Sequence, residues 1–185
     1  ITVDEANGRL PVYAGTGEVT TEKAVDLTRY AKNVGADAAS VVTPYFIKPS
    51  SEELYAHYAK IAEAVDMPIV LYNNPDRTGV NIEASTVSRL SEIDNIVGIK
   101  DSSGDLTLTA EYIRLTRERF SVIAGRDSLI LATLLYGGKA AIAATANVAP
   151  KQVVEIYEAF IKGDIEGARE AQFRILPLRS AFSLG

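Results

Sequence analysis

Ile96-Val97-Gly98-Ile99-Lys100 is an apolar run that closes on a lysine, and Asp101-Ser102-Ser103-Gly104-Asp105 follow it at once. The run predicts a buried β-strand with Lys100 at its carboxyl end. Burial disfavours the ammonium form of a lysine, and the neutral amine that results is a nucleophile. The alternative is a lysine whose stem is buried while its head stays in solvent. Lys100 is therefore the first candidate for chemistry.

A matching apolar run, Pro68-Ile69-Val70-Leu71-Tyr72, ends 28 residues earlier on a tyrosine. Short apolar runs of this kind alternate with amphipathic segments along the chain. We expect strands at Leu10–Gly15, Ala38–Thr43, Pro68–Tyr72, Ile96–Lys100, Phe120–Gly125 and Lys139–Thr145. We expect helices at Thr20–Val34, Ser50–Val65, Ile82–Ile93, Leu106–Arg119, Ser128–Tyr136, Pro150–Lys162 and Asp164–Phe182. A spacing near 28 residues is typical of one parallel strand plus one crossover helix.

Two α/β architectures have this pattern, namely a (β/α)8 TIM barrel and an open doubly wound sheet. The open sheet usually has a glycine-rich phosphate loop after its first strand, and Ala14-Gly15-Thr16-Gly17 is only a weak match to one. Polar residues at several successive strand ends favour the barrel, where all strand ends build one site. Only six βα units are visible, and the chain opens on the tail of a helix. We expect a fragment that lacks roughly two leading units, with residues 1–149 as a partial barrel and 150–185 as a truncated C-terminal helical segment.

Composition narrows the classes of function. The chain has 185 residues, a net charge of −5 and no cysteine, so disulfides and thiolate metal sites are excluded. The single histidine, His57, cannot form a histidine cluster, and we predict no metal site. No basic stretch indicates nucleic acid, and no apolar stretch reaches the roughly 18 residues of a membrane span. Without signal-peptide character at its start, the chain is predicted to be cytoplasmic.

Further candidates lie at or near the predicted strand ends. Strand alternation places Gly98 and Lys100 on one face, so the amine and the phenol of Tyr72 would meet at the top of a barrel. A phenol beside an amine relays protons during imine formation. Arg77 offers a forked donor for a carboxylate, or else pairs with Asp76 or Asp101 on the surface. Two more residues are candidates through their backbones: Gly125, which either approaches a ligand or makes a turn, and Ile142, which otherwise is core.

These residues resemble a known family. Tyr-Asn-x-Pro-x-Arg-Thr-Gly at Tyr72 to Gly79, followed by Gly-Ile-Lys-Asp around Lys100, resembles the dihydrodipicolinate synthase and N-acetylneuraminate lyase family. The likeness extends through nearly the whole chain, including Val42-Thr43-Pro44-Tyr45 and Thr145-Ala146-Asn147. It implies a class I, Schiff-base-forming pyruvate lyase on a (β/α)8 barrel.

The resemblance also implies roles for single residues. Lys100 would form the imine with pyruvate or another 2-oxo acid, and Tyr72 would relay protons. Arg77 would bind a carboxylate of the second substrate, an aldehyde. Three further positions would line the substrate pocket: Thr78, Gly125 and Ile142. No metal or organic cofactor is implied, because the protonated imine is the electron sink. The family is commonly tetrameric, and Tyr45 and Phe46 would face a partner subunit.

Two departures from the family pattern leave the activity open. The family's Gly-Thr-Thr-Gly-Glu loop is absent, and Gly15-Thr16-Gly17-Glu18 imitates it one strand too late. We therefore expect the loop upstream of Ile1, and the fragment alone to be incomplete for catalysis. Phe46 stands where synthases usually carry a second tyrosine. This admits a 2-oxo-3-deoxy sugar acid aldolase or dehydratase, or a non-catalytic barrel fragment or paralogue. An open-sheet nucleotide binder is the third alternative.

Overall fold

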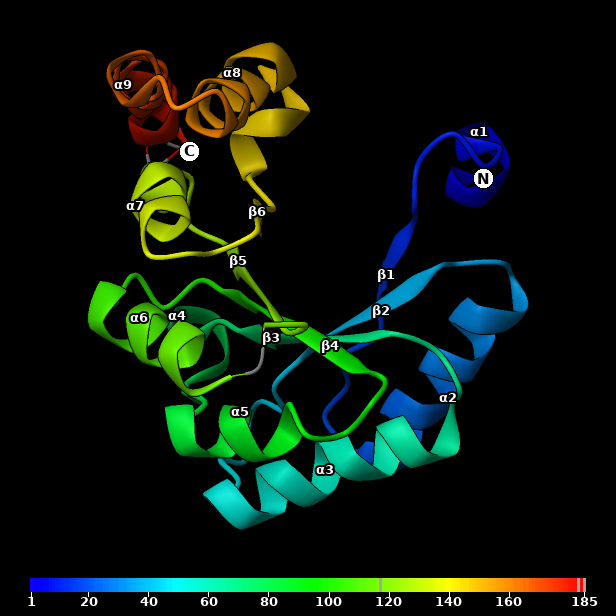
Figure 1. Ribbon diagram of the computed structural model, residues 1–185. Helices are drawn as coiled ribbons and strands as arrows, with labels where there is room; N and C mark the ends of the chain where they lie inside the picture. Colours follow the sequence, from blue (N-terminus) through cyan, green and yellow to red (C-terminus); the bar gives the residue numbers. More distant parts are fainter. Residues whose placement is uncertain (117, 183, 185) are drawn as a thin grey trace. The chain divides into compact units, whose positions relative to one another are not determined.

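A computed structural model describes residues 1–116, 118–182 and 184 (Figure 1). The strands are β1 (Tyr13–Gly15), β2 (Ala38–Val42), β3 (Ile69–Asn73), β4 (Ile96–Asp101), β5 (Ser121–Ala124) and β6 (Ala140–Ala141), and they follow one another in the sheet in chain order. The helices are α1 (Thr2–Ala6), α2 (Thr21–Asn33), α3 (Ser51–Ala64), α4 (Pro75–Thr78), α5 (Ala84–Leu90), α6 (Leu106–Leu115), α7 (Ile130–Leu135), α8 (Pro150–Ile161) and α9 (Ile165–Ala181). Two short 3-10 turns, η1 (Asp127–Leu129) and η2 (Ala144–Asn147), flank α7 and β6.

The chain divides into two compact units, and the boundary falls inside β4. Unit 1 comprises Ile1–Ile99 and Leu115–Phe120, and unit 2 comprises Lys100–Arg114 and Ser121–Gly185. The sequence predicts a partial barrel over residues 1–149 and a helical segment over residues 150–185. That boundary separates strands and helices from helices alone, not one compact unit from another, and it stays a prediction.

Unit 1 contains the parallel strands β1, β2 and β3. The register pairs Ala14 with Ala39 and Val42 with Tyr72, so the strand ends at Gly15, Val42 and Tyr72 lie at the same edge. Figure 1 shows α2, α3 and α5 on one side of these strands, and α3 packs against both of the other helices. β2 and β3 are largely buried, and their side chains are mostly apolar, as is typical of parallel strands.

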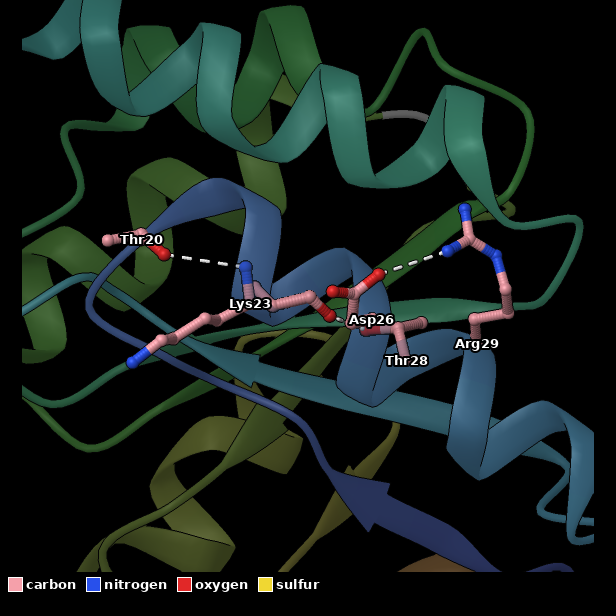
Figure 2. Close-up of polar contacts among 6 residues, drawn as sticks. Thr20, Lys23, Asp26, Thr28 and Arg29 are labelled. Carbon is pink, nitrogen blue, oxygen red and sulfur yellow. Dashed lines mark hydrogen bonds and ion pairs between the residues drawn. The ribbon is translucent and has the colours of Figure 1, made fainter.

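Side chains fix the starts of the two long helices of unit 1. The Thr20 hydroxyl accepts a hydrogen bond from the Lys23 N–H at the start of α2, as Figure 2 shows. Ser50 and Glu53 form a reciprocal capping box at the start of α3. Such caps satisfy N–H groups that have no partner within the helix. The helix predicted at Ser50–Val65 is confirmed as α3, Ser51–Ala64.

Unit 2 is built around β5, β6 and the last three helices. Figure 1 shows α8 and α9 side by side next to α7. The apolar core between these elements consists of Ala124, Ile130, Leu131, Leu134, Ile156, Ala168, Ala171 and Ile175. β5 and β6 are parallel and pair Ile123 with Ala140.

Several helices and strands are shorter than the sequence predicted. The last strand was predicted at Lys139–Thr145 but spans only Ala140–Ala141, because the chain then turns into η2. The helix predicted at Ile82–Ile93 is α5, Ala84–Leu90, since the Ile82 N–H is bonded instead to the Asn73 side chain. The predicted helix Leu106–Arg119 ends at Leu115. Residue 117 of that prediction, and residues 183 and 185 of the predicted C-terminal segment, lie outside the described residues.

Candidate active site

The strand ends of unit 1 carry polar side chains that are bonded to one another. Thr16, directly after β1, is buried, and its hydroxyl accepts from that of Thr28 on α2 at 2.8 Å. Thr43, directly after β2, is buried as well, and its hydroxyl donates to the Thr78 hydroxyl at 2.9 Å. Helix α2 is thereby tied to the end of β1, and the loop after β3 to the end of β2.

Asn73 and Thr78 hold the loop between β3 and α5. The Asn73 side chain is buried; it donates to the Asn81 side-chain oxygen Oδ1 at 2.8 Å and accepts from the Ile82 N–H at 3.1 Å. The Thr78 hydroxyl accepts from the Val80 N–H at 3.2 Å. Gly79 ends α4 with a φ of 70°, a backbone conformation that glycine adopts without strain. The loop thus has a defined shape.

Tyr72 lies in β3, one residue before the strand ends, and Arg77 lies in α4 within this loop. Tyr72 is half-buried, and its phenolic oxygen accepts a hydrogen bond from the Asn74 amide at 2.9 Å. Arg77 is exposed, and its guanidinium has no hydrogen-bond or ion-pair partner among the described residues. The considered pairing of Arg77 with Asp76 is therefore not found among the described residues, while the pairing with Asp101 joins different units and stays a prediction.

Tyr45 and Phe46 belong to the loop between β2 and α3. Tyr45 is 40% exposed and Phe46 is 92% exposed. Phe46 has a φ of 77°, which is an outlier for a bulky residue. An exposed aromatic side chain on a strained backbone is a candidate contact surface, as predicted for these two residues.

Lys100 is the first residue of unit 2 and lies near the end of β4, where it is half-buried. The neighbouring Asp101 is buried and braces the following turn. Its carboxylate accepts from the Ser103 N–H at 3.0 Å and from the Thr109 hydroxyl at 2.6 Å. Lys100 therefore extends from a backbone that is fixed on its carboxyl side.

Gly125 follows β5 and leaves no room for a side chain. A Cβ atom added there would lie 2.1 Å from Ser102 Oγ and 2.8 Å from the Asp101 carbonyl oxygen. The Gly125 N–H donates to that same carbonyl at 2.8 Å. The next residue, Arg126, donates to the Ser102 carbonyl at 2.8 Å. The glycine is thus needed because two backbone segments lie close together here, and its approach to a ligand stays a prediction.

Ile142 is not a mid-strand core residue as its position suggested. It lies just beyond β6 and is 39% exposed, while its N–H donates to the Ala124 carbonyl at 2.9 Å. The strand ends early because Asp127, which is buried, accepts from the N–H groups of Ala144 and Thr145 at 3.1 and 2.9 Å. Two N–H groups held by one carboxylate are directed away from a strand ladder.

His57 is a core histidine. Its Nδ1 lies 2.9 Å from the Thr21 hydroxyl, and its Nε2 is buried without a partner among the described residues. Burial lowers the pKa of His57 to about 4, so it is neutral at physiological pH. In the part of the chain that the structure describes, no group of three or more His, Cys, Asp or Glu side chains could hold a metal ion. No described helix has the length and apolar character needed to cross a bilayer.

The predicted site residues fall into two sets. Tyr72 in β3 and Arg77 and Thr78 in the loop after it belong to unit 1, whereas Lys100, Gly125 and Ile142 belong to unit 2. The predicted meeting of the phenol and the amine joins residues of different units and stays a prediction. Two residues were missed: Asn74, bonded to the phenol, and Asp127, which ends β6. An aspartate just after a strand-end glycine was the available signal for the second.

Comparison with known proteins places these observations in a family. The model of the dihydrodipicolinate synthetase family matches residues 1–184. The chain is 48% identical over 182 residues to the 4-hydroxy-tetrahydrodipicolinate synthase of Methanopyrus kandleri, covering 98% of this chain and 61% of that protein. It is 41% identical to the structure of dihydrodipicolinate synthase from Aquifex aeolicus, with a TM-score of 0.96 and coverage of 99% of this chain and 63% of that one.

A third relative is the chloride-inhibited dihydrodipicolinate synthase of Acinetobacter baumannii, whose structure is complexed with pyruvate. Identity is 43%, the TM-score is 0.93, and 96% of this chain and 61% of that one are covered. The chain therefore spans about three fifths of the length of these relatives. The predicted fold class, an α/β fragment of a (β/α)8 barrel, is confirmed.

Proposed function

The chain belongs to the dihydrodipicolinate synthetase family, and from this premise we propose that the intact protein is a pyruvate-dependent Schiff-base lyase of the 4-hydroxy-tetrahydrodipicolinate synthase type. The observation that carries the proposal is the family match over residues 1–184, within which Lys100 lies one residue before the end of β4. The complex of the Acinetobacter baumannii relative with pyruvate supports pyruvate as the first substrate.

Lys100 is the proposed nucleophile. Its amine nitrogen attacks C2 of pyruvate, and loss of water from the carbinolamine leaves an imine. Removal of a proton from C3 converts the imine into an enamine. The enamine carbon then attacks the carbonyl carbon of an aldehyde, forming the new carbon–carbon bond while the aldehyde oxygen takes up a proton. Hydrolysis of the imine releases the product and restores the amine. The proposal includes no metal or organic cofactor.

Tyr72 is the proposed proton relay in these steps. Its phenol lies at the end of β3 and is half-buried, which keeps it within reach of a ligand at the strand ends. A positioned phenol gives a proton to the hydroxyl that leaves the carbinolamine and recovers one later.

The remaining residues are proposed to bind the substrates. The exposed Arg77 guanidinium suits a carboxylate on the aldehyde substrate, and Thr78 fixes the loop that carries it. Gly125, which has no side chain, and Ile142, which is bonded through its backbone to Ala124, would present main chain to the 2-oxo acid.

Assembly and location belong to the same proposal. Exposed Tyr45 and Phe46 support a homo-oligomer, which we propose is a tetramer, with these residues at a subunit contact. The protein is proposed to be cytoplasmic. Phe46 favours a second candidate within the family, an aldolase or dehydratase for 2-oxo-3-deoxy sugar acids, because a phenylalanine has no hydroxyl with which to relay protons.

Trapping with borohydride tests the proposal. Reduction in the presence of pyruvate should add to Lys100 the mass of pyruvic acid less one oxygen atom, located by peptide mass spectrometry. Lys100→Arg keeps the charge and should remove the adduct. An intact, folded protein that forms no adduct, or forms it on another lysine, would show a non-catalytic paralogue or a different site. Product analysis with several aldehydes and sugar acids separates the two candidates.

A further inference from the structure

Asn74 is the first residue of the loop after β3, and its side chain does not cap the helix that follows. It is the N-cap of α4, a position where an asparagine side chain normally accepts a hydrogen bond from the first turn of the helix. No side-chain cap hydrogen bond is formed here. Instead, the Asn74 amide donates to the phenolic oxygen of Tyr72 at 2.9 Å.

The backbone of Asn74 contacts the other residues of this loop. Its carbonyl oxygen accepts from the Arg77 N–H at 3.1 Å and from the Thr78 N–H at 3.0 Å. The Thr78 hydroxyl lies 3.1 Å from the same carbonyl. The backbone of Asn74 is therefore held by the helix that follows, and its half-buried side chain extends from a fixed point. A donor anchored in this way holds the phenol at the cost of little conformational entropy.

We propose that Asn74 is a positioning residue for Tyr72, whose amide N–H holds the phenolic oxygen and directs the phenol's own proton to the substrate. The inference rests on the proposed role of Tyr72 as a proton relay. A phenol has one O–H donor, and Asn74 occupies one acceptor site on the oxygen. A hydrogen bond donated to that oxygen also favours the phenolate over the phenol, which aids removal of a proton from pyruvate.

The test compares variants of the intact protein. Asn74→Ala removes the donor, and Asn74→Asp keeps the shape but offers only acceptors to the phenol. We expect kcat to fall about tenfold in both, which corresponds to the loss of one hydrogen bond in the transition state. KM for pyruvate should stay within about twofold, since the amide acts on the phenol rather than on the binding groups. The limb of the kcat pH profile that reports the phenol should move to higher pH.

Asn81→Ala is the matched control. It removes the acceptor of the Asn73 side chain in the same loop, and among the described residues no hydrogen bond joins Asn81 to the phenol. We expect a lower melting temperature and an unchanged pH profile. A pH profile that shifts as far in Asn81→Ala as in Asn74→Ala would show that loop order, and not the donated hydrogen bond, is what matters, and the inference would fall.

The borohydride adduct keeps this inference separate from the proposed function. If the unchanged protein forms no adduct at Lys100, the proposed function fails. If every variant forms the adduct and Asn74→Asp keeps normal kcat and pH dependence, only the role of Asn74 fails, because an acceptor would then serve the phenol equally well.

Discussion

In unit 1 the buried polar side chains are neutral, whereas in unit 2 two of them are carboxylates. Among the described residues, unit 1 buries threonines, one serine, Asn73 and His57, and unit 2 buries Asp101 and Asp127. The neutral groups of unit 1 mostly meet one or two partners each. The carboxylates of unit 2 gather backbone N–H groups and hydroxyls that are close together.

The difference indicates how each unit fixes its strand ends. A hydrogen bond to a charged group stabilises by about 1.5 to 3 kcal/mol, against about 1 kcal/mol for a neutral pair. Losing a carboxylate also leaves buried donors without partners. The strand ends of unit 2 should therefore tolerate substitution less well than those of unit 1. Four predictions test this contrast.

The largest effect is expected for a glycine that follows a strand of unit 2, and a glycine that ends a strand of unit 1 is its control. Gly125→Ala should lower the free energy of unfolding by about 4 kcal/mol, because the new methyl group would overlap Ser102 Oγ and the backbone of Asp101. Gly15→Ala, at the end of β1, places its methyl group where no atom lies within 4 Å and should be near neutral. Urea denaturation measures both. Equal losses in the two variants would break the comparison.

The second prediction removes one side chain of each kind. Asp127→Ala should cost about 3 kcal/mol, because the N–H groups of Ala144 and Thr145 lose their acceptor. Asn73→Ala in unit 1 should cost about 1 to 2 kcal/mol. Asp127→Asn keeps one acceptor oxygen and should fall between Asp127→Ala and the unchanged protein. The same denaturation midpoints report all three variants, and a costlier Asn73→Ala would reverse the argument.

The third prediction concerns pH and His57 in unit 1. Burial lowers the pKa of His57 from 6.5 to about 4, so the unfolded chain binds more protons than the folded one between these values. Its contribution to stability is therefore complete above pH 6.5 and falls by about 2 to 3 kcal/mol as pH drops toward 4. Melting temperatures across this range, compared with His57→Gln, measure the difference. The variant should lose that part of the pH dependence, and parallel curves would contradict the assignment.

The smallest effect is expected for two threonine hydroxyls. Thr78→Val removes a hydroxyl bonded to Thr43 and Val80 and should destabilise by about 1 kcal/mol. Thr145→Val in unit 2 removes a buried hydroxyl that has no partner among the described residues, and it should be neutral or stabilising by up to about 1 kcal/mol. Thermal unfolding measures both variants, and a loss of stability in Thr145→Val as large as that in Thr78→Val would contradict the hydrogen-bond account.

The sequence predicted those parts of the fold that depend on local pattern. Among the described residues, apolar runs separated by amphipathic segments identified the six strands, since parallel strands are typically rich in apolar residues. The last strand was overextended because Ala140 to Thr145 is compatible with a strand. What ends it is Asp127, whose bonds to Ala144 and Thr145 span 17 and 18 residues. No window of local pattern contains that contact.

In the candidate site, too, the residues with a local sequence signal were predicted and one without such a signal was missed. Lys100 and Tyr72 were found because a polar residue that closes a buried strand is conspicuous in sequence. Asn74 was not found, because an asparagine before a proline and a helical turn is common as a helix cap and does not stand out in sequence. In the folded structure, its amide instead donates a hydrogen bond to the phenolic oxygen of Tyr72.

Gln172 in α9 has a consequence for synthesis of the chain. Its amide donates to the carbonyl oxygen of Asp127, 45 residues earlier, and accepts from the Leu131 N–H, 41 residues earlier. On the ribosome, η1 and the start of α7 are translated long before their partner. Because folding proceeds from the amino terminus during translation, this part of unit 2 must wait for α9 to leave the exit tunnel. A nascent chain that stalls before Gln172 is released would keep the turn after β5 open to chaperones and proteases.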